Sequence, residues 1–337
     1  MALRLIKILP PKNTEDLEQL FDDDNVVDYW IEQTDSGQKS ITLLADVELT
    51  EKILNDLDSK FSESDDFRIV LLPVAATIPK HEVEDVEKED EGGEAKKDDD
   101  RVKRISREEL YEDIKEVVDI SWVYLVLIAL SCIVAANGLI RNSPAMVIGA
   151  MVIAPILGPN VGLALATTLG DKALLKRSLK SIAYGFSLGM VLSIAMGFLF
   201  ALDPEVYEIE SRTVVSFADI ALGLAAGVAG CLSFTRGISA AVIGVMVAVA
   251  LLPPMVATGL LLGSGMYELA FGAGLLTLTY IICVNLAGVL TFLVQGIRPN
   301  DFSEQKDGEE FSRYAIIIWV SLLVMLAGII YWQFVLE

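Results

Sequence analysis

Hydrophobic positions divide the chain into a patterned N-terminal part and a largely apolar C-terminal part. Over residues 1–80, the alternating and helical patterns predict strands at 3–9, 26–34, 40–45 and 67–74 and helices at 14–21 and 50–61. The order βαββαβ predicts a small, soluble α+β domain of the ferredoxin-like type. Domains of this kind bind small ligands or pair with copies of themselves, and others are structural caps. The pattern leaves these roles open, together with a regulatory role for the head.

The segment that follows is polar. Residues 81–104 contain few apolar side chains and predict an acidic, flexible linker. Ser106 and Glu109 have the spacing of a capping box, which predicts an amphipathic helix over 105–118 at the membrane surface. His81 is the only histidine and lies in the linker, so we expect no catalytic histidine, no metal site and no cofactor.

Seven apolar segments fill residues 119–337, each near the length of about 20 residues that a helix needs to cross a bilayer. They lie at 119–140, 143–169, 181–202, 216–235, 237–263, 267–295 and 313–335. This pattern predicts a membrane all-α bundle of about seven transmembrane helices.

The apolar part contains an internal repeat. The segment AMVIGAMVIAPILGPNV at 145–161 recurs 95 residues later as AAVIGVMVAVALLPPMV at 240–256. The three spans within 119–202 therefore match those within 216–295, and the span at 313–335 stands alone. Three crossings bring the second copy in from the opposite side, an inverted 3+3 repeat. If the proline-containing segments are re-entrant instead, the later loops change sides.

Prolines interrupt the same helix in both copies: Pro155 and Pro159 in the first, Pro253 and Pro254 in the second. Proline has no N–H and clashes with the preceding turn, so it frees backbone groups that neighbouring helices, water or a solute must satisfy. A helix restarting after 158–160 would point N–H groups and a positive dipole end into a cavity, which slightly favours an anion. A kinked packing helix is the alternative.

Two groups of residues follow as candidates for the site. The candidates for solute binding or gating lie at the breaks or are amides inside spans: Pro155, Gly158, Pro159, Asn160, Pro253, Pro254 and Asn285. The candidate charge partners precede the two motifs or lie near span ends: Arg141, Arg236, Asp171, Asp219 and Glu268.

The charge balance and the positions of the cysteines limit the classes of partner and ligand that the chain can bind. Residues 1–118 carry 16 Lys or Arg and 33 Asp or Glu, a balance of −17, and the remainder carries 10 and 14, a balance of −4. Such an acidic chain does not fit nucleic-acid binding, and it suits either a salt-loving host or an ordinary acidic domain. The three cysteines lie in apolar runs without metal-ligand spacing.

Basic loop residues predict the orientation. They are concentrated on the side of the N-terminal head, which favours a cytoplasmic head, an outside C-terminus and an inner-membrane location. The glycine pairs 185/189, 223/227 and 259/263 have GxxxG spacing, which permits close helix approach within or between subunits and predicts a homo-oligomer in the lipid bilayer.

Two motifs carry a resemblance to a known family. The stretch GAMVIAPILGPNVGLALATTLGD at 149–171 and the preceding SREELYEDI at 106–114 resemble signatures of the domain of unknown function 389 family. The resemblance implies a multi-pass membrane protein and brings no substrate or catalytic residue with it.

The combined pattern predicts a transporter or channel-like permease and no enzymatic activity. A membrane-anchored scaffold or sensor is the alternative. An intramembrane aspartyl protease, which would need Asp171 and Asp219 to meet, is less favoured.

Overall fold

The computed structural model describes residues 3–10, 26–33, 39–46, 50, 52–55, 57, 67–74, 105–236, 240–298 and 302–336, with backbone alone for 33, 39, 46, 240–250, 302–312, 315 and 332–336. It divides into two compact units, Met1–Glu109 and Leu110–Glu337. The predicted linker and the helix predicted at 14–21 lie outside the described residues.

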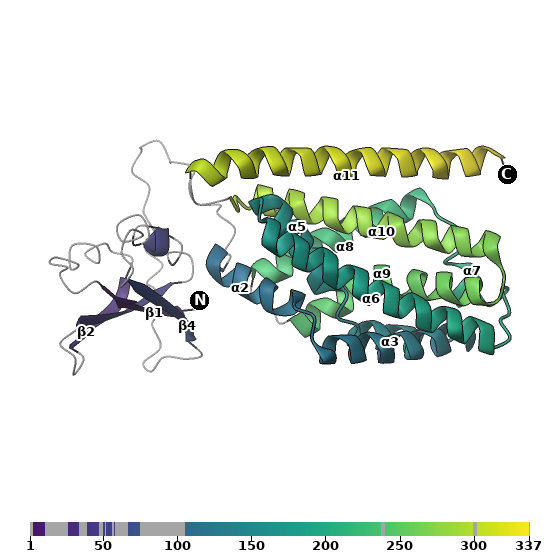
Figure 1. The fold of residues 1–337 in the computed structure, drawn as a ribbon, viewed down its shortest axis with the longest axis horizontal. Helices are drawn as coiled ribbons and strands as arrows, with labels where there is room; N and C mark the ends of the chain where they lie inside the picture. Colours follow the sequence, from purple (N-terminus) through teal and green to yellow (C-terminus); the bar gives the residue numbers. More distant parts are fainter. Residues whose placement is uncertain are drawn as a thin grey trace, which may run out of the picture. The chain divides into compact units, whose positions relative to one another are not determined.

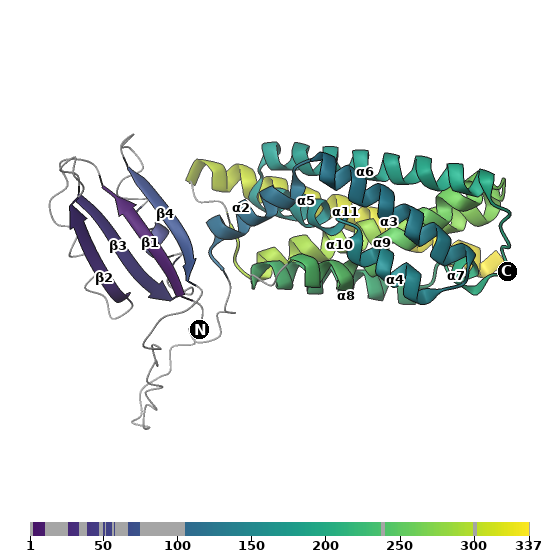
Figure 2. The same ribbon diagram turned by 90° about the horizontal axis from the view of Figure 1, so that it is seen from below.

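A four-stranded antiparallel sheet forms the first unit, as the strand pattern predicts. The strands are β1 (Leu3–Leu9), β2 (Val26–Gln33), β3 (Lys39–Asp46) and β4 (Arg68–Val74). They lie side by side in the order β2-β3-β1-β4 (Figure 2), with Ile6 opposite Leu43 and Leu71. The ferredoxin-like assignment also needs two helices and stays a prediction.

One face of the sheet carries the core of this unit. Alternate residues of β1 and β3 are buried there together with Leu54 and Leu57, which belong to the second predicted helix region. Arg4 lies on the same face, and its guanidinium forms two hydrogen bonds of 3.0 and 2.6 Å with the carboxylate of Glu109. The N–H of Glu109 is capped by Ser106, as predicted, while its carboxylate binds Arg4.

Helices make up the second unit (Figure 1). They are α2 (Arg107–Val118), α3 (Trp122–Ile140), α4 (Pro144–Ile153), α5 (Leu157–Leu169), α6 (Lys172–Leu199), α7 (Tyr207–Glu210), α8 (Phe217–Thr235), α9 (Ala240–Gly263), α10 (Tyr267–Val294) and α11 (Phe302–Leu336). We call the two ends of this bundle the α2 end and the α7 end.

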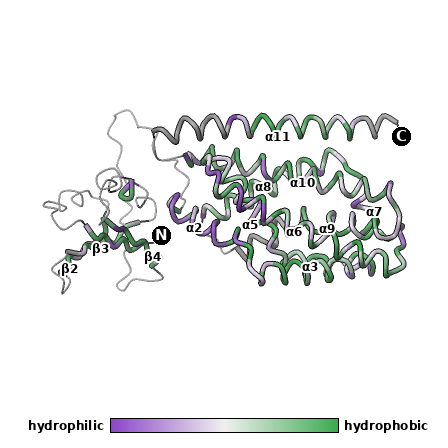
Figure 3. Tube along the Cα trace, viewed as in Figure 1, coloured by the Kyte–Doolittle hydropathy of each residue, from purple (hydrophilic) through white to green (hydrophobic). Residues whose placement is uncertain are grey.

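Several of these helices are long and apolar enough to cross a membrane. Among the described residues four qualify (α3, α6, α8 and α10), and the bent pair α4 and α5 makes a fifth. Shorter apolar stretches lie in α9, at Leu251–Gly263, and in α11, at Ile316–Tyr331. Hydrophobic residues line these helices along their lengths, and hydrophilic residues gather toward the α2 end (Figure 3). The second unit is therefore that of a multi-pass membrane protein.

The helix boundaries recur at the spacing of the sequence repeat. Helices α3 and α8 both have 19 residues and start 95 positions apart, and α6 and α10 both have 28 residues and start 95 positions apart. Arg141 and Arg236 are the C-caps of α3 and α8. Gly170 and Gly265 both have positive φ, at 72° and 78°, in the turns before α6 and α10.

Contacts between the two halves also recur, with the halves exchanged. A Cβ added at Gly288 of α10 would lie 2.7 Å from the Cβ of Ala164 in α5. The equivalent contact joins Gly259 of α9 to Ser193 of α6, where an added Cβ would overlap the serine Cβ. Asn160 of α5 contacts Asn285 of α10, and Ala164, one turn later in α5, contacts Gly288, one turn later in α10. The residue numbers rise in the same direction along both helices, so α5 and α10 run parallel. Helices α9 and α6 run parallel by the same reasoning.

The two copies differ at their prolines. In the first copy the chain bends by 53° between α4 and α5, as predicted, and Ala154 before Pro155 has an extended ψ of 119°. In the second copy α9 continues through Pro253 and Pro254, so the break predicted there is wrong. The fully buried Leu252 and its neighbours pack on α6 and α10, and this packing outweighs the backbone bonds that the two prolines remove.

The predicted GxxxG pairs are used inside the chain. All six glycines approach a neighbouring helix closely enough that an added Cβ would lie within van der Waals distance or overlap it. At Gly263 the added atom would overlap the carbonyl oxygen of Ile194, whereas Gly149 has no atom within 4 Å of that position. Helix contact within the chain explains these pairs, and a homo-oligomer stays a prediction.

We expect Gly263→Ala to lower the free energy of unfolding by about 1–3 kcal/mol, because the added methyl group must push α6 and α9 apart. The matched control Gly149→Ala meets no atom and should stabilise by up to about 1 kcal/mol through helix propensity. Thermal melting of both purified variants in detergent checks this. Equal melting temperatures for the two variants would contradict the close contact.

Candidate functional site

The break between α4 and α5 frees backbone groups inside the bundle. Helix α4 ends at Ile153, and the N–H of Ala154 still reaches the carbonyl of Ala150. Pro155 has no N–H, so it cannot continue this ladder to the carbonyl of Met151, four residues earlier. Helix α5 restarts at Leu157, four residues earlier than the predicted restart after Asn160, with Gly158, Pro159 and Asn160 in its first turn.

Asn160 and Asn285, the two amides singled out from the sequence, meet at this break. Both are fully buried, with 0% exposure. The Nδ2 of Asn285 donates to the Oδ1 of Asn160 at 3.1 Å and to the carbonyl of Ile281 at 2.9 Å. The Nδ2 of Asn160 donates to the carbonyl of Ile156 at 2.9 Å, within the break itself.

One atom of this pair has no protein partner. Among the described residues, the Oδ1 of Asn285 accepts no hydrogen bond although it is buried. A buried acceptor without a partner costs about 1–3 kcal/mol, so the position favours a bound donor or cation. At 1.5 Å per residue, Asn285 lies about 7 Å beyond the midpoint of α10, toward the α2 end.

The equivalent positions in the other half are apolar. Met255 of α9 lies 95 positions after Asn160, and Met190 of α6 lies 95 positions before Asn285. Met255 is fully buried, and its methyl group lies 2.6 Å from where a Cβ of Gly189 would be. The two halves therefore share a backbone plan but place a polar pair on one side alone.

Helix α2 covers the restart of α5. Its buried residues Leu110, Ile114 and Val118 form an apolar stripe, which packs along α5 rather than standing free. A Cβ at Gly158 would lie 2.9 Å from a methyl group of Val117 and 3.2 Å from the Val117 carbonyl oxygen. The carbonyl end of α2 thus lies beside the N–H end of α5, where the opposite dipole ends partly neutralise each other.

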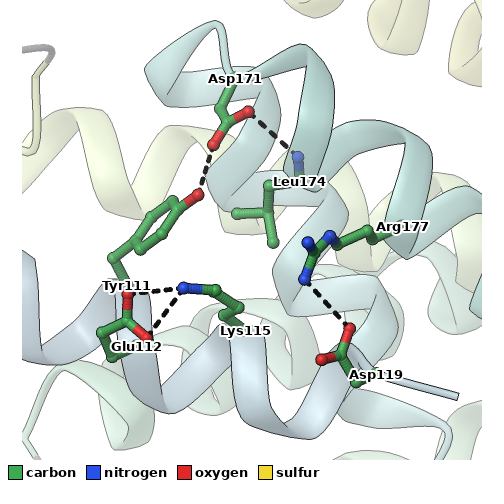
Figure 4. A network of polar contacts seen from close by, with 7 residues as sticks. All are labelled: Tyr111, Glu112, Lys115, Asp119, Asp171, Leu174 and Arg177. Atoms are coloured by element: carbon green, nitrogen blue, oxygen red, sulfur yellow. Dashed lines mark hydrogen bonds and ion pairs between the residues drawn. The ribbon is translucent and has the colours of Figure 1, made fainter.

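A hydrogen bond ties the other end of α2 to the loop between α5 and α6 (Figure 4). The hydroxyl of Tyr111 donates to Asp171 at 2.6 Å. Asp171 is the N-cap of α6 and accepts from the N–H groups of Ala173 and Leu174 at 2.7 and 3.0 Å. Beside it, Arg177 and Asp119 form an ion pair of 3.3 Å.

This network shifts the pKa values of two side chains, Tyr111 and Asp171. Burial, followed by the hydrogen bond to Asp171, raises the pKa of Tyr111 to about 12. Burial alone would raise the pKa of Asp171, but the hydrogen bonds from Tyr111, Leu174 and Ala173 outweigh it and hold that pKa below its usual value of 3.8.

The candidate charge partners take structural positions away from the amide pair. Asp171 caps α6 at the α2 end, and Asp219 caps α8 at the α7 end, where Tyr280 donates to it at 2.9 Å. The two carboxylates that an aspartyl protease would need are thus at opposite ends of the bundle. Arg141, Arg236 and Glu268 are exposed at helix ends.

The remaining polar residues of the spans satisfy local carbonyls for the most part. Thr167, Thr168, Thr258, Thr277 and Thr279 each donate to a carbonyl three or four residues earlier. Thr258 bonds the carbonyl of Pro254, so the second proline pair lies in packed helix and not at an open site. Among the described residues, no hydrogen bond joins Pro253 or Pro254 to the Asn160–Asn285 pair.

Sequence reasoning missed the role of α2 over the break. Gly158 and Gly162 have GxxxG spacing, and an added Cβ at Gly162 would overlap a methyl group of Val118. This spacing, combined with the apolar stripe of the helix before it, was the available signal. Tyr111 had no signal, because its partner Asp171 is 60 positions away.

Comparisons with known proteins agree with the resemblance seen in the motifs. The family model described as a domain of unknown function (DUF389) matches residues 151–286. The uncharacterized protein MJ0678 of Methanocaldococcus jannaschii is 32% identical over 326 residues, covering 96% of this chain and 97% of that protein. The chain belongs to the DUF389 family. No solved structure matches it.

The matched DUF389 region contains the break and both amides of the site. It begins at Met151, in the last turn of α4, and it ends at Leu286, one residue after Asn285. The names of the family and of the relative specify no activity, so the function has to be argued from the geometry.

We expect Tyr111→Phe to lower the free energy of unfolding by about 1 kcal/mol near neutral pH, because it removes a partly exposed hydrogen bond to a carboxylate. The depressed pKa of Asp171 stabilises the fold above pH 3.8, and this contribution is lost as pH falls through the folded pKa. Melting temperatures between pH 3 and pH 7, roughly the range that spans this transition, check both effects. Tyr184→Phe, at an exposed tyrosine of α6, is the control and should melt like the parent.

Proposed function

We propose that this protein is a membrane permease that moves a small ion or polar solute past the Asn160–Asn285 pair. The observation that carries the proposal is the pair itself: two fully buried amides that meet at a helix break, with one acceptor oxygen lacking a partner. Polar groups inside a membrane bundle are costly, and they mark pathways and solute sites when they face its interior.

The arrangement of the two halves supports an inverted repeat. Helices α6 and α9 run parallel, as do α5 and α10, whereas α5 and α6 are consecutive and joined by the short turn at Gly170. It follows that α6 and α10, which occupy equivalent places in the repeat, run in opposite directions, as Figure 1 also shows. Transporters built on such repeats place their solute site at broken helices between the halves.

We further propose seven crossings, with α9 and α11 completing the five that are long and apolar enough by themselves. Basic residues favour a cytoplasmic α2 end. The α2 end carries Lys172, Lys176, Arg177, Lys180, Arg236 and Arg298, and the α7 end carries Arg141 and Arg212. The C-terminus then lies outside. The opposite positions of Asp171 and Asp219 favour transport over an enzymatic reaction at this site.

Flux measurements on proteoliposomes test the permease. We expect the full chain to carry at least one probe faster than empty liposomes, with Na⁺, K⁺, Cl⁻, urea and glycerol as the panel. Asn285→Leu should reduce that flux by at least about ten-fold, since a loss of 1.4 kcal/mol at a site already has that effect. The control Asn137→Leu removes an amide of α3 that bonds only its own helix at Ile133, and it should keep the flux.

Two outcomes would end the proposal. One is that no probe crosses faster than in empty liposomes, which would favour a scaffold or sensor. The other is that Asn285→Leu, verified as folded, carries the probe at the parental rate, which would remove the amide pair from the pathway.

Cysteine labelling tests the orientation. Lys176→Cys and Glu205→Cys are exposed positions at the α2 end and near α7, and the native cysteines are buried. We expect a membrane-impermeant maleimide to label intact cells at position 205 and to label position 176 only after permeabilisation. Labelling of both positions from one side would contradict the odd number of crossings between them.

A further inference from the structure

We propose that the Asn160–Asn285 pair is a binding site for a small monovalent cation, with the Oδ1 of Asn285 as one ligand. This inference rests on the permease proposal for the location of the pathway and adds the chemical class of its ligand. It reverses the slight preference for an anion that the sequence alone suggests.

The hydrogen bonds of the pair leave an acceptor available and use the donors of Asn285. Both hydrogens of its Nδ2 have carbonyl partners, on Asn160 and on Ile281. Its Oδ1 has no partner among the described residues. Swapping the oxygen and nitrogen of this amide would put an oxygen against both of those carbonyl oxygens, so the hydrogen bonds themselves set the orientation. An anion would meet this oxygen with like polarity, whereas a cation would satisfy it.

The break also leaves carbonyl oxygens of α4 without their usual helical partners. The C-terminal end of α4 directs its last carbonyl groups toward the break, and Pro155 has no N–H to offer the carbonyl of Met151. Unwound carbonyls and the C-terminal ends of half-helices are the groups that coordinate small cations in broken-helix transporters, while half-helix N-termini bind anions. At this break the N-terminal end of α5 already lies beside the Val117 carbonyl of α2.

The charges around the site agree with a neutral set of oxygen ligands. Among the buried residues described in α2 to α11, none is Lys or Arg, so no basic side chain stands ready to hold an anion. The described part of the chain also has no group of three His, Cys, Asp or Glu, which a transition metal would require. Amide and carbonyl oxygens without a carboxylate suit a singly charged alkali cation.

Thermal melting in matched salts tests the site without depending on transport. Full-length protein in detergent would be melted in chloride salts of Na⁺, K⁺, Li⁺ and N-methyl-D-glucamine at equal ionic strength, and in Na⁺ gluconate. We expect a saturable rise of about 5 °C or more with one alkali cation at 100 times its dissociation constant, independent of the anion. A melting temperature that does not depend on the cation overturns the proposal, and this is the result expected if only a water molecule binds the Oδ1 of Asn285. A rise that follows the anion overturns it as well.

Two variants assign the effect to Asn285. Asn285→Asp replaces the Nδ2 donor by a second oxygen, which would face the oxygens of Asn160 and Ile281 and so lower the stability of the cation-free protein. The added negative charge should nevertheless tighten the apparent cation affinity by about ten-fold or more. Asn285→Leu should abolish the cation-dependent rise, and Asn137→Leu should retain it. If Asn285→Leu does not fold, the Asp variant decides alone, because an anion site would lose affinity with the same substitution. Unchanged affinity in Asn285→Asp would place the ion elsewhere.

The outcomes also separate this inference from the permease proposal. Cation-dependent melting without flux of any probe keeps the site and removes the permease function. If a probe crosses the membrane but the melting temperature does not depend on any cation, the permease proposal stands and the cation site is removed.

Discussion

Every backbone N–H and C=O inside a bilayer must find a partner within the protein, and the break between α4 and α5 is where this chain departs from a simple helix. Pro155 ends the ladder of α4, and the structure surrounds the gap with groups from distant segments. Asn160 bonds the carbonyl of Ile156, Asn285 reaches Asn160 from α10, and Val117 covers Gly158 from α2. The gap is therefore polar and covered by other helices, while the Oδ1 of Asn285 still lacks a partner among the described residues.

The two halves combine a shared backbone with different chemistry. Equal helix lengths, recurring caps and the exchanged contacts Ala164–Gly288 and Ser193–Gly259 follow one plan. Side chains then distinguish the halves, since the amide pair in one corresponds to Met190 and Met255 in the other. The two halves therefore differ in polarity at the equivalent positions, and the buried amide pair lies on one side only.

Helix α2 connects this site to the residues that precede it in the chain. It runs antiparallel to α5, with Tyr111 beside Asp171 at the end of α5 and Val117 beside Gly158 at its start. Any displacement of α2 would therefore uncover both the glycine face of α5 and the first turn that contains Asn160.

The sequence by itself determined the four strands, the apolar helices, the 95-residue repeat and the break at Pro155, because these depend on local periodicity and on the covalent limits of proline. It also singled out Asn160 and Asn285 as buried amides. Only the tertiary structure decided that they meet, that α9 continues through Pro253 and Pro254, and that Asp171 and Asp219 are caps at opposite ends. The reason is that each depends on contacts between residues far apart in the chain, 125 positions in the case of the amides, whose packing outweighs local preference.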